Sequence, residues 1–227
     1  MADPSPPLVL RLARAAVALA VDLLLLAWGM GGFAAVFAAP RALALLAIWG
    51  AAGVTLTLTR PTRGQDTTRT EKDPFAMLLL AIIPLGTPAL SAWGARTGTW
   101  LLPAPEALGW LGVALSALGL YMRVAAMLQL GTRFSPLLAV QREHALETTG
   151  WYAVVRHPGY LGALLANLGA SIAFGSALAL PAALVMVVVQ ADRVRREERL
   201  LAGHFGEVWQ AYARRTGALL PRLFGAR

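Results

Sequence analysis

The amino-acid sequence predicts an all-α, polytopic integral membrane protein. We expect a bundle of about six membrane-embedded helices, the last two forming a short hairpin, with a small cytoplasmic cap. Of the 227 residues, 57% are hydrophobic and 14% are charged, whereas a typical soluble domain has about 25% charged residues. The mean hydropathy is +0.60. The basic residues, which give a net charge of +8, flank the apolar runs, as the positive-inside rule describes.

The same composition excludes several classes of protein. Too little of the chain is polar for intrinsic disorder. Because the sequence has no cysteine, a disulfide scaffold, a thiolate metal site and a cysteine nucleophile are excluded. The three histidines are scattered and no HExxH or phosphate-loop motif is present, so we expect no metal. The basic residues lack the interleaved aromatic residues of a nucleic-acid surface, so no nucleic acid is expected as a partner.

Four apolar runs in residues 1–130 predict a four-helix N-terminal transmembrane region. A bilayer core about 30 Å thick needs about 20 apolar residues per helix. The runs are 9–37, 42–59, 74–94 and 106–130. In the first, we expect the glycines of GMGGF (29–33) to allow close packing within one helix. In the third, Pro84 and Pro88 predict a kink.

The last apolar run, 158–190, predicts the hairpin. Its 33 residues would make a helix roughly 50 Å long at 1.5 Å per residue, which is too long for one crossing. Gly175 and Ser176 form a turn signal in its middle. We therefore predict two short helices, 158–174 and 177–191. With six crossings, 17 basic residues lie on the side of the N-terminus and only Arg41 and Arg96 on the other, so both termini are expected to be cytoplasmic.

Two polar clusters, 141–160 and 192–206, stand at the two ends of this hairpin and should therefore meet. They offer histidine, tyrosine and glutamate side chains suited to a charged, hydroxyl-bearing ligand. The alternative is that they are an interfacial helix start, with proline in the first turn, and a solvated basic helix with intrahelical ion pairs. The sequence after residue 198 predicts one amphipathic helix, 198–215. Its apolar stripe, which we expect to pack in the core, is Leu201, Phe205, Val208, Trp209 and Tyr212.

Several segments, in this order, resemble the isoprenylcysteine carboxyl methyltransferase family and the related phospholipid methyltransferases. They are LGTRFSP (130–136), EHALETTGWYAVVRHPGYLG (143–162), the apolar hairpin, RVRREERLL (193–201), HFGEVWQAY (204–212) and TGALLPRL (216–223). The resemblance covers roughly the last 40% of the chain. It implies a methyltransferase core over residues 131–227 that forms a single structural domain with the N-terminal helices.

The resemblance implies an integral membrane enzyme that uses S-adenosyl-L-methionine. The positions that match the family's cofactor pocket are Gln141, His144, Ala145, Leu146, Glu147, Tyr152, His157, Pro158, Gly159, Tyr160 and Glu197. Arg193 matches the arginine that family members are thought to use for substrate. Glu147 and Trp151 depart from the family pattern, but neither departure removes a polar ligand. The active site is expected on the cytoplasmic side.

The predicted reaction is carboxyl O-methylation of a lipophilic, isoprenylcysteine-type acceptor that enters from the surrounding membrane lipids. A carboxylate is ionised at pH 7 and needs no general base, and Arg193 could clamp it in a bidentate pair. An amine or hydroxyl acceptor would need a base, for which Glu198 is the candidate. Arg123, a charge inside a span, is expected either to bind substrate or to snorkel to the interface.

Two alternatives remain open at this point. One is a phospholipid or other small-lipophile N-, O- or S-methyltransferase. The other is a non-enzymatic membrane transporter or scaffold protein, which would not bind S-adenosylhomocysteine.

Overall fold

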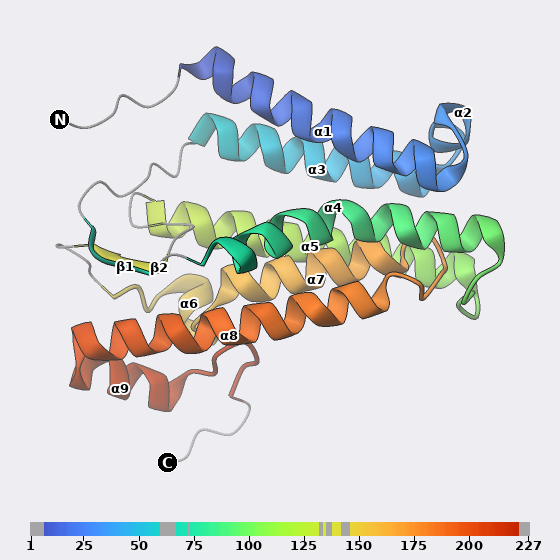
Figure 1. Cartoon of the computed structure of the whole chain (residues 1–227). Helices are drawn as coiled ribbons and strands as arrows, with labels where there is room; N and C mark the ends of the chain where they lie inside the picture. The colour runs from blue at the N-terminus through green and yellow to red at the C-terminus, as the bar shows by residue number, and fades with distance from the viewer. Residues whose placement is uncertain are drawn as a thin grey trace.

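The computed structural model describes residues 7–59, 67–71, 73–131, 134, 138–141 and 146–222. Figure 1 shows an elongated helical bundle with a small two-stranded ribbon at one end. The helices are α1 (Leu8–Met30), α2 (Phe33–Phe37), α3 (Pro40–Thr59), α4 (Pro74–Thr97), α5 (Pro105–Leu130), α6 (Gly150–Val154), α7 (Pro158–Ile172), α8 (Leu180–Phe205) and α9 (Glu207–Arg215). The strands are β1 (Thr67–Glu71) and β2 (Leu138–Gln141).

The helical membrane architecture is confirmed. Three helices of the described part, α3, α4 and Glu106–Leu130 of α5, are long and apolar enough to cross a membrane. The apolar core lies at the end of the bundle away from the ribbon, where the helix ends meet. It includes Leu26, Val36, Leu45, Val113 and Phe174. The count of six embedded segments stays a prediction.

The first apolar run is not one helix as predicted. It breaks at Gly31 and Gly32, whose φ angles of +90° and +137° suit glycine because other residues rarely adopt them. Of the GMGGF glycines, Gly29 does have the expected packing role. A Cβ atom at Gly29 would lie 2.4 Å from the Ala89 carbonyl oxygen of α4, so α1 and α4 approach too closely for any side chain there.

Glycines also determine the packing of α5 on α7, which is the most extensive helix contact of the bundle. Gly119 faces Gly162, and Gly112 faces Gly169, so the two pairs are seven positions apart on both helices. A Cβ atom at Gly162 would lie 2.5 Å from the Gly119 carbonyl oxygen. This close contact holds the first turn of α7 beside the last two turns of α5.

The hairpin is present, but its second helix is longer than predicted. Helices α7 and α8 pack against each other and run in opposite directions (Figure 1). Helix α8 continues past the predicted end at residue 191 to Phe205, because the polar segment after the apolar run is also rich in helix-forming Arg, Glu and Leu.

The single helix predicted over 198–215 is wrong. Gly206, with φ +54°, ends α8 and begins α9. Trp209 and Tyr212 are buried as the apolar stripe predicted, whereas Val208 is 63% exposed. Helix α9 turns back along α8 at the ribbon end of the bundle (Figure 1).

Strands β1 and β2 form an antiparallel ribbon that the sequence did not predict. Thr67 pairs with Gln141, and Glu71 pairs with Leu138. The ribbon joins the connection between α3 and α4 to the segment that follows α5. Strand β2 also lies against α8, so an N-terminal loop becomes part of the end of the bundle that carries the two polar clusters.

Candidate active site

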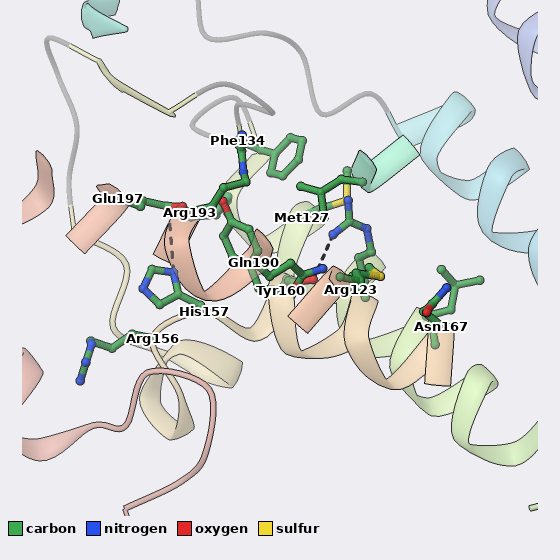
Figure 2. Close-up of a pocket in the computed structure, with 18 of the residues that line it drawn as sticks. Arg123, Met127, Phe134, Arg156, His157, Tyr160, Asn167, Gln190, Arg193 and Glu197 are labelled. Atoms are coloured by element: carbon green, nitrogen blue, oxygen red, sulfur yellow. Dashed lines mark hydrogen bonds and ion pairs between the residues drawn. The ribbon is translucent and has the colours of Figure 1, made fainter. Parts of the chain in front are cut away.

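A cavity of about 550 Å³ has most of its lining residues on α4, α5, α7 and α8. Its polar end lies where α6 and α7 begin, and Figure 2 shows His157, Tyr160, Arg193 and Glu197 grouped there. The wall that α4 and α5 contribute is apolar apart from Arg123. Its apolar side chains include Met77, Leu80, Ala81, Pro84, Leu85, Leu120, Met127 and Leu130.

The hairpin brings the two predicted polar clusters together. His157, the residue before the first turn of α7, is only 4% exposed and faces two glutamates of α8. Its Nε2 atom lies 3.2 Å from Glu198 Oε1, and its Nδ1 atom lies 4.0 Å from Glu197 Oε1. The His157 ring also packs edge-on against Tyr160. The two clusters are therefore in contact. Pro158 also begins α7 and Arg196 pairs with Asp192 within α8, as the alternative interpretation expected.

Glu198 is held by two cationic or hydrogen-bonding partners. Arg156 Nε donates to Glu198 Oε1 at 2.8 Å, and Arg156 Nη2 lies 2.8 Å from the same oxygen. Burial alone would raise the pKa of Glu198, but the hydrogen bonds and charges of His157 and Arg156 lower it to about 2. A carboxylate with so low a pKa is a weak base. Glu198 is thus engaged by Arg156 and His157 and is not among the residues that line the cavity, and its general-base role stays a prediction.

The segment after α9 fixes the backbone of the RHP motif. The amide of Arg156 donates to the Gly217 carbonyl at 2.8 Å, and the amide of His157 donates to the Ala218 carbonyl at 3.0 Å. Arg156 Nη1 also donates to the carbonyls of Ala213 and Thr216. Both segments resemble family motifs, but nothing in the sequence indicates that they touch.

Arg193 is buried, with 4% of its surface exposed. It lines the cavity one helical turn before Glu197 on α8. The Tyr160 phenol lies within the electrostatic influence of both Arg193 and Glu197. A cation, a carboxylate and a phenol therefore meet at one point of the cavity wall, as Figure 2 shows.

The Arg123 side chain is directed toward α7. Its Nη1 atom donates to the Gly159 carbonyl oxygen at 3.0 Å, and the side chain lines the cavity. Because it satisfies a carbonyl in the first turn of α7, Arg123 connects α5 to the motif that carries His157.

Glu147 and Tyr152 reach the same cavity from the segment before α7. Glu147 Oε1 accepts from the Thr149 amide at 3.1 Å and from the Thr149 hydroxyl. The Tyr152 hydroxyl donates to the Ala126 carbonyl of α5 at 3.3 Å. These bonds hold the start of α6 against the end of α5.

Most of the predicted residues whose side chains are described line this one cavity. They are Arg123, Leu146, Glu147, Tyr152, His157, Gly159, Tyr160, Arg193 and Glu197. Pro158 is buried as the first residue of α7, and Glu198 lies behind His157. Gln141 belongs to β2; its side chain, and both His144 and Ala145, lie outside the described residues. In the described part, no three His, Asp or Glu side chains gather as a metal site would require.

The sequence reasoning missed other residues of the cavity wall. Asn167 and Gln190 are polar and almost fully buried, and both line the cavity. The spacing of Gln190, Arg193 and Glu197 along α8 would have placed all three on one helical face. Asn167 lies inside an apolar run and carries no such signal.

Comparison with known proteins agrees with the resemblance to isoprenylcysteine carboxyl methyltransferases. The model of the isoprenylcysteine carboxyl methyltransferase (ICMT) family matches residues 111–203. The protein-S-isoprenylcysteine O-methyltransferase of Schizosaccharomyces pombe is 36% identical over 119 residues, which are 51% of this chain and 48% of that protein. The cobalt-zinc-cadmium resistance protein CzcN of Cupriavidus metallidurans is 38% identical over 131 residues, 56% of this chain and 53% of that protein. The chain thus spans about half the length of these curated relatives.

The fold is similar to that of a solved structure, the eukaryotic intramembrane Ras methyltransferase ICMT. That match has a TM-score of 0.63 and covers 96% of this chain and 77% of that chain, at 21% identity. The likeness therefore extends through the N-terminal helices, where the family model does not reach.

Proposed function

We propose that the protein, whose residues 111–203 match the model of the ICMT family, is an integral membrane, S-adenosyl-L-methionine-dependent methyltransferase. Its reaction is carboxyl O-methylation of a lipophilic, isoprenylcysteine-type acceptor. The observation that carries the proposal is a cavity that has a polar end and, on α4 and α5, an apolar wall. A methyl donor and the head of the acceptor need the polar end, and the acceptor's chain needs the apolar wall.

The residues of the polar end fit the proposed methyl donor. Leu146, Glu147, Tyr152, His157, Gly159, Tyr160 and Glu197 line the cavity, and Gln141, Pro158 and the His144–Ala145 pair complete the set that the family resemblance implies. Glu197 can balance a cationic ligand, and Glu147 and Tyr160 can bond polar groups. The cavity's 550 Å³ lies within the range of about 300–1,000 Å³ typical of small-molecule sites. When bound, S-adenosyl-L-methionine supplies an already activated methyl group.

Arg193 is the residue we assign to the acceptor carboxylate. A guanidinium can hold both oxygens of a carboxylate at once, and its burial strengthens that interaction by excluding water. Tyr160 and Glu197 orient Arg193 in the cavity. The chain's task is then to place the carboxylate in line with the methyl group, which is a matter of orientation and not of proton transfer. Arg123 contributes by fixing Gly159 at the cavity wall.

The proposed topology has six membrane-embedded segments, with both termini and the active site cytoplasmic. The 17-to-2 distribution of basic residues supports this sidedness. The start of α1, the β1–β2 ribbon, α6 and α9 all lie at one end of the bundle (Figure 1). In this proposal, residues 1–130 form the N-terminal transmembrane region, and residues 131–227 form the methyltransferase core with its cofactor-binding cap.

The experiment uses detergent-purified protein, methyl-labelled S-adenosyl-L-methionine and N-acetyl-S-farnesylcysteine. Carboxyl methylation yields a lipid-soluble product whose label is released by alkali, because esters hydrolyse. Label that survives alkali would indicate N-methylation and overturn the carboxylate assignment. Calorimetry with S-adenosylhomocysteine tests the cofactor separately, and an absence of binding would favour a transporter or scaffold protein.

A further inference from the structure

Two buried carboxamide oxygens on the cavity wall lack a hydrogen-bond partner among the described residues. They are Gln190 Oε1 on α8 and Asn167 Oδ1 on α7. The two side chains are only 2% and 4% exposed, and both line the cavity. The Asn167 amide is oriented by the bond from its Nδ2 atom to Thr87 Oγ1, at 2.8 Å. Two hydrogen-bond acceptors thus lie at the wall without a donor.

The two oxygens lie deeper than the proposed reaction centre. Gln190 is three residues before Arg193 on the same face of α8, and Asn167 is seven residues after Tyr160 on α7. At 1.5 Å per residue, these positions lie about 5 Å and about 10 Å further into the bundle. Figure 2 shows Arg123 between Gln190 and Asn167. Gln190 and Asn167 therefore lie where the chain of an acceptor would pass, and Arg193 lies where its carboxylate would be held.

A plain hydrocarbon chain does not suit this wall. A buried carbonyl oxygen without a partner is unfavourable, and a carboxamide oxygen can only accept a hydrogen bond. A site built with a polar group rejects a ligand that leaves the group unpaired. The matching ligand group is consequently a donor, either a hydroxyl or an N–H.

We propose that, among lipophilic acceptors of this type, the protein prefers one that carries a hydroxyl or N–H group on the part of its chain inside the bundle, about 5–10 Å from the methylated carboxylate. Gln190 and Asn167 receive this donor. The inference rests on the proposed function, because it assumes that the acceptor's chain lies in this cavity.

The test uses three S-alkylcysteines with twelve-carbon chains: one plain, one with a hydroxyl on the fourth carbon and one with a ketone there. We expect the full-length protein to show a kcat/KM at least tenfold higher for the hydroxyl compound than for the other two. Gln190→Leu and Asn167→Leu should each reduce this ratio severalfold. Val188→Leu, on the exposed side of α8, is the matched control and should leave the ratio unchanged.

Equal kcat/KM values for the three compounds in the unmodified protein, or a preference for the ketone, overturn the inference while the methyltransferase function stands. If none of the compounds is methylated, the proposed function fails on these acceptors, and binding decides the inference. The hydroxyl compound should then raise the thermal unfolding midpoint more than the plain compound does. Equal shifts overturn the inference in that case also.

Discussion

Glu198 Oε1 accepts a hydrogen bond from Arg156 Nε at 2.8 Å, and this pair joins α8 to the residue that precedes His157. The same carboxylate oxygen lies 3.2 Å from His157 Nε2. The RHP motif and the acidic pair after the hairpin are thus two halves of one ion-paired cluster. The charged residues of these two segments are therefore required by their contacts with each other as much as by any ligand.

Replacing Glu198 by glutamine should destabilise the protein by about 2 kcal/mol at neutral pH, because hydrogen bonds to charged groups contribute roughly 1.5–3 kcal/mol. The folded-state pKa of about 2 lies below the ordinary value of 4.5. The stabilisation is therefore complete above pH 4.5 and is lost as the pH falls through about 2. Thermal unfolding of both proteins across this range should show their midpoints converging. A constant difference at every pH would contradict the assignment.

Glu197→Ala should weaken S-adenosylhomocysteine binding at least tenfold while the protein still folds. The lost hydrogen bonds cost about 1.5–3 kcal/mol, and 1.4 kcal/mol corresponds to a factor of ten. Calorimetry on the purified protein measures the affinity directly. Glu207→Ala, at the exposed start of α9, is the control for a general loss of negative charge. An unchanged affinity in Glu197→Ala would remove this residue from the cofactor site.

Arg193→Lys should reduce turnover strongly and leave cofactor affinity within a few-fold. Lysine keeps the charge but loses the planar fork that holds both carboxylate oxygens in line with the methyl group. Arg195→Lys is the matched control, because Arg195 is on the same helix and is exposed. Arg196 is unsuitable, since it lies 2.7 Å from Asp192 and 3.6 Å from Asp73. Full turnover by Arg193→Lys, or lost cofactor binding, would refute the clamp.

Gly162→Ala should destabilise the bundle by about 1–3 kcal/mol, the usual effect of forcing an extra group into a packed interface. The added methyl would meet the backbone of α5, which has no flexible side chain to move aside. Gly203→Ala is a matched control inside α8, where nothing lies within 4 Å of the new methyl. It should be neutral or stabilising by up to about 1 kcal/mol, as alanine favours helix. Thermal unfolding in detergent compares the two.

Reporter fusions at Gly64 and after Arg227 should both indicate the cytoplasmic side, because the basic residues lie there in the six-segment topology. A fusion within 98–104, the connection between α4 and α5, should indicate the opposite side. Opposite results for Gly64 and Arg227 would require an odd number of crossings between them, and the hairpin could not then be membrane-embedded as proposed.

Hydropathy predicted most of the helices because apolar runs of sufficient length are a local signal. It failed at helix ends that depend on backbone conformation, as at Gly31 and Gly206, and beyond residue 191, where α8 continues with polar residues. The predicted meeting of the two polar clusters followed from the hairpin alone. Contacts between distant segments carry no periodic signal, and neither the pairing of Gly217 with Val155 nor that of Gly119 with Gly162 was predictable.

The β1–β2 ribbon has a consequence for how this protein can be dissected. A fragment cut after residue 130 would carry β2 without β1, and would leave its edge unpaired. A chimaera that replaces residues 1–130 must therefore supply not only helices of the right length but also a strand that matches residues 67–71 in register. Within residues 1–130, we therefore expect the sequences of relatives to vary least at residues 67–71. These residues lie in the part of the chain that the family model does not match.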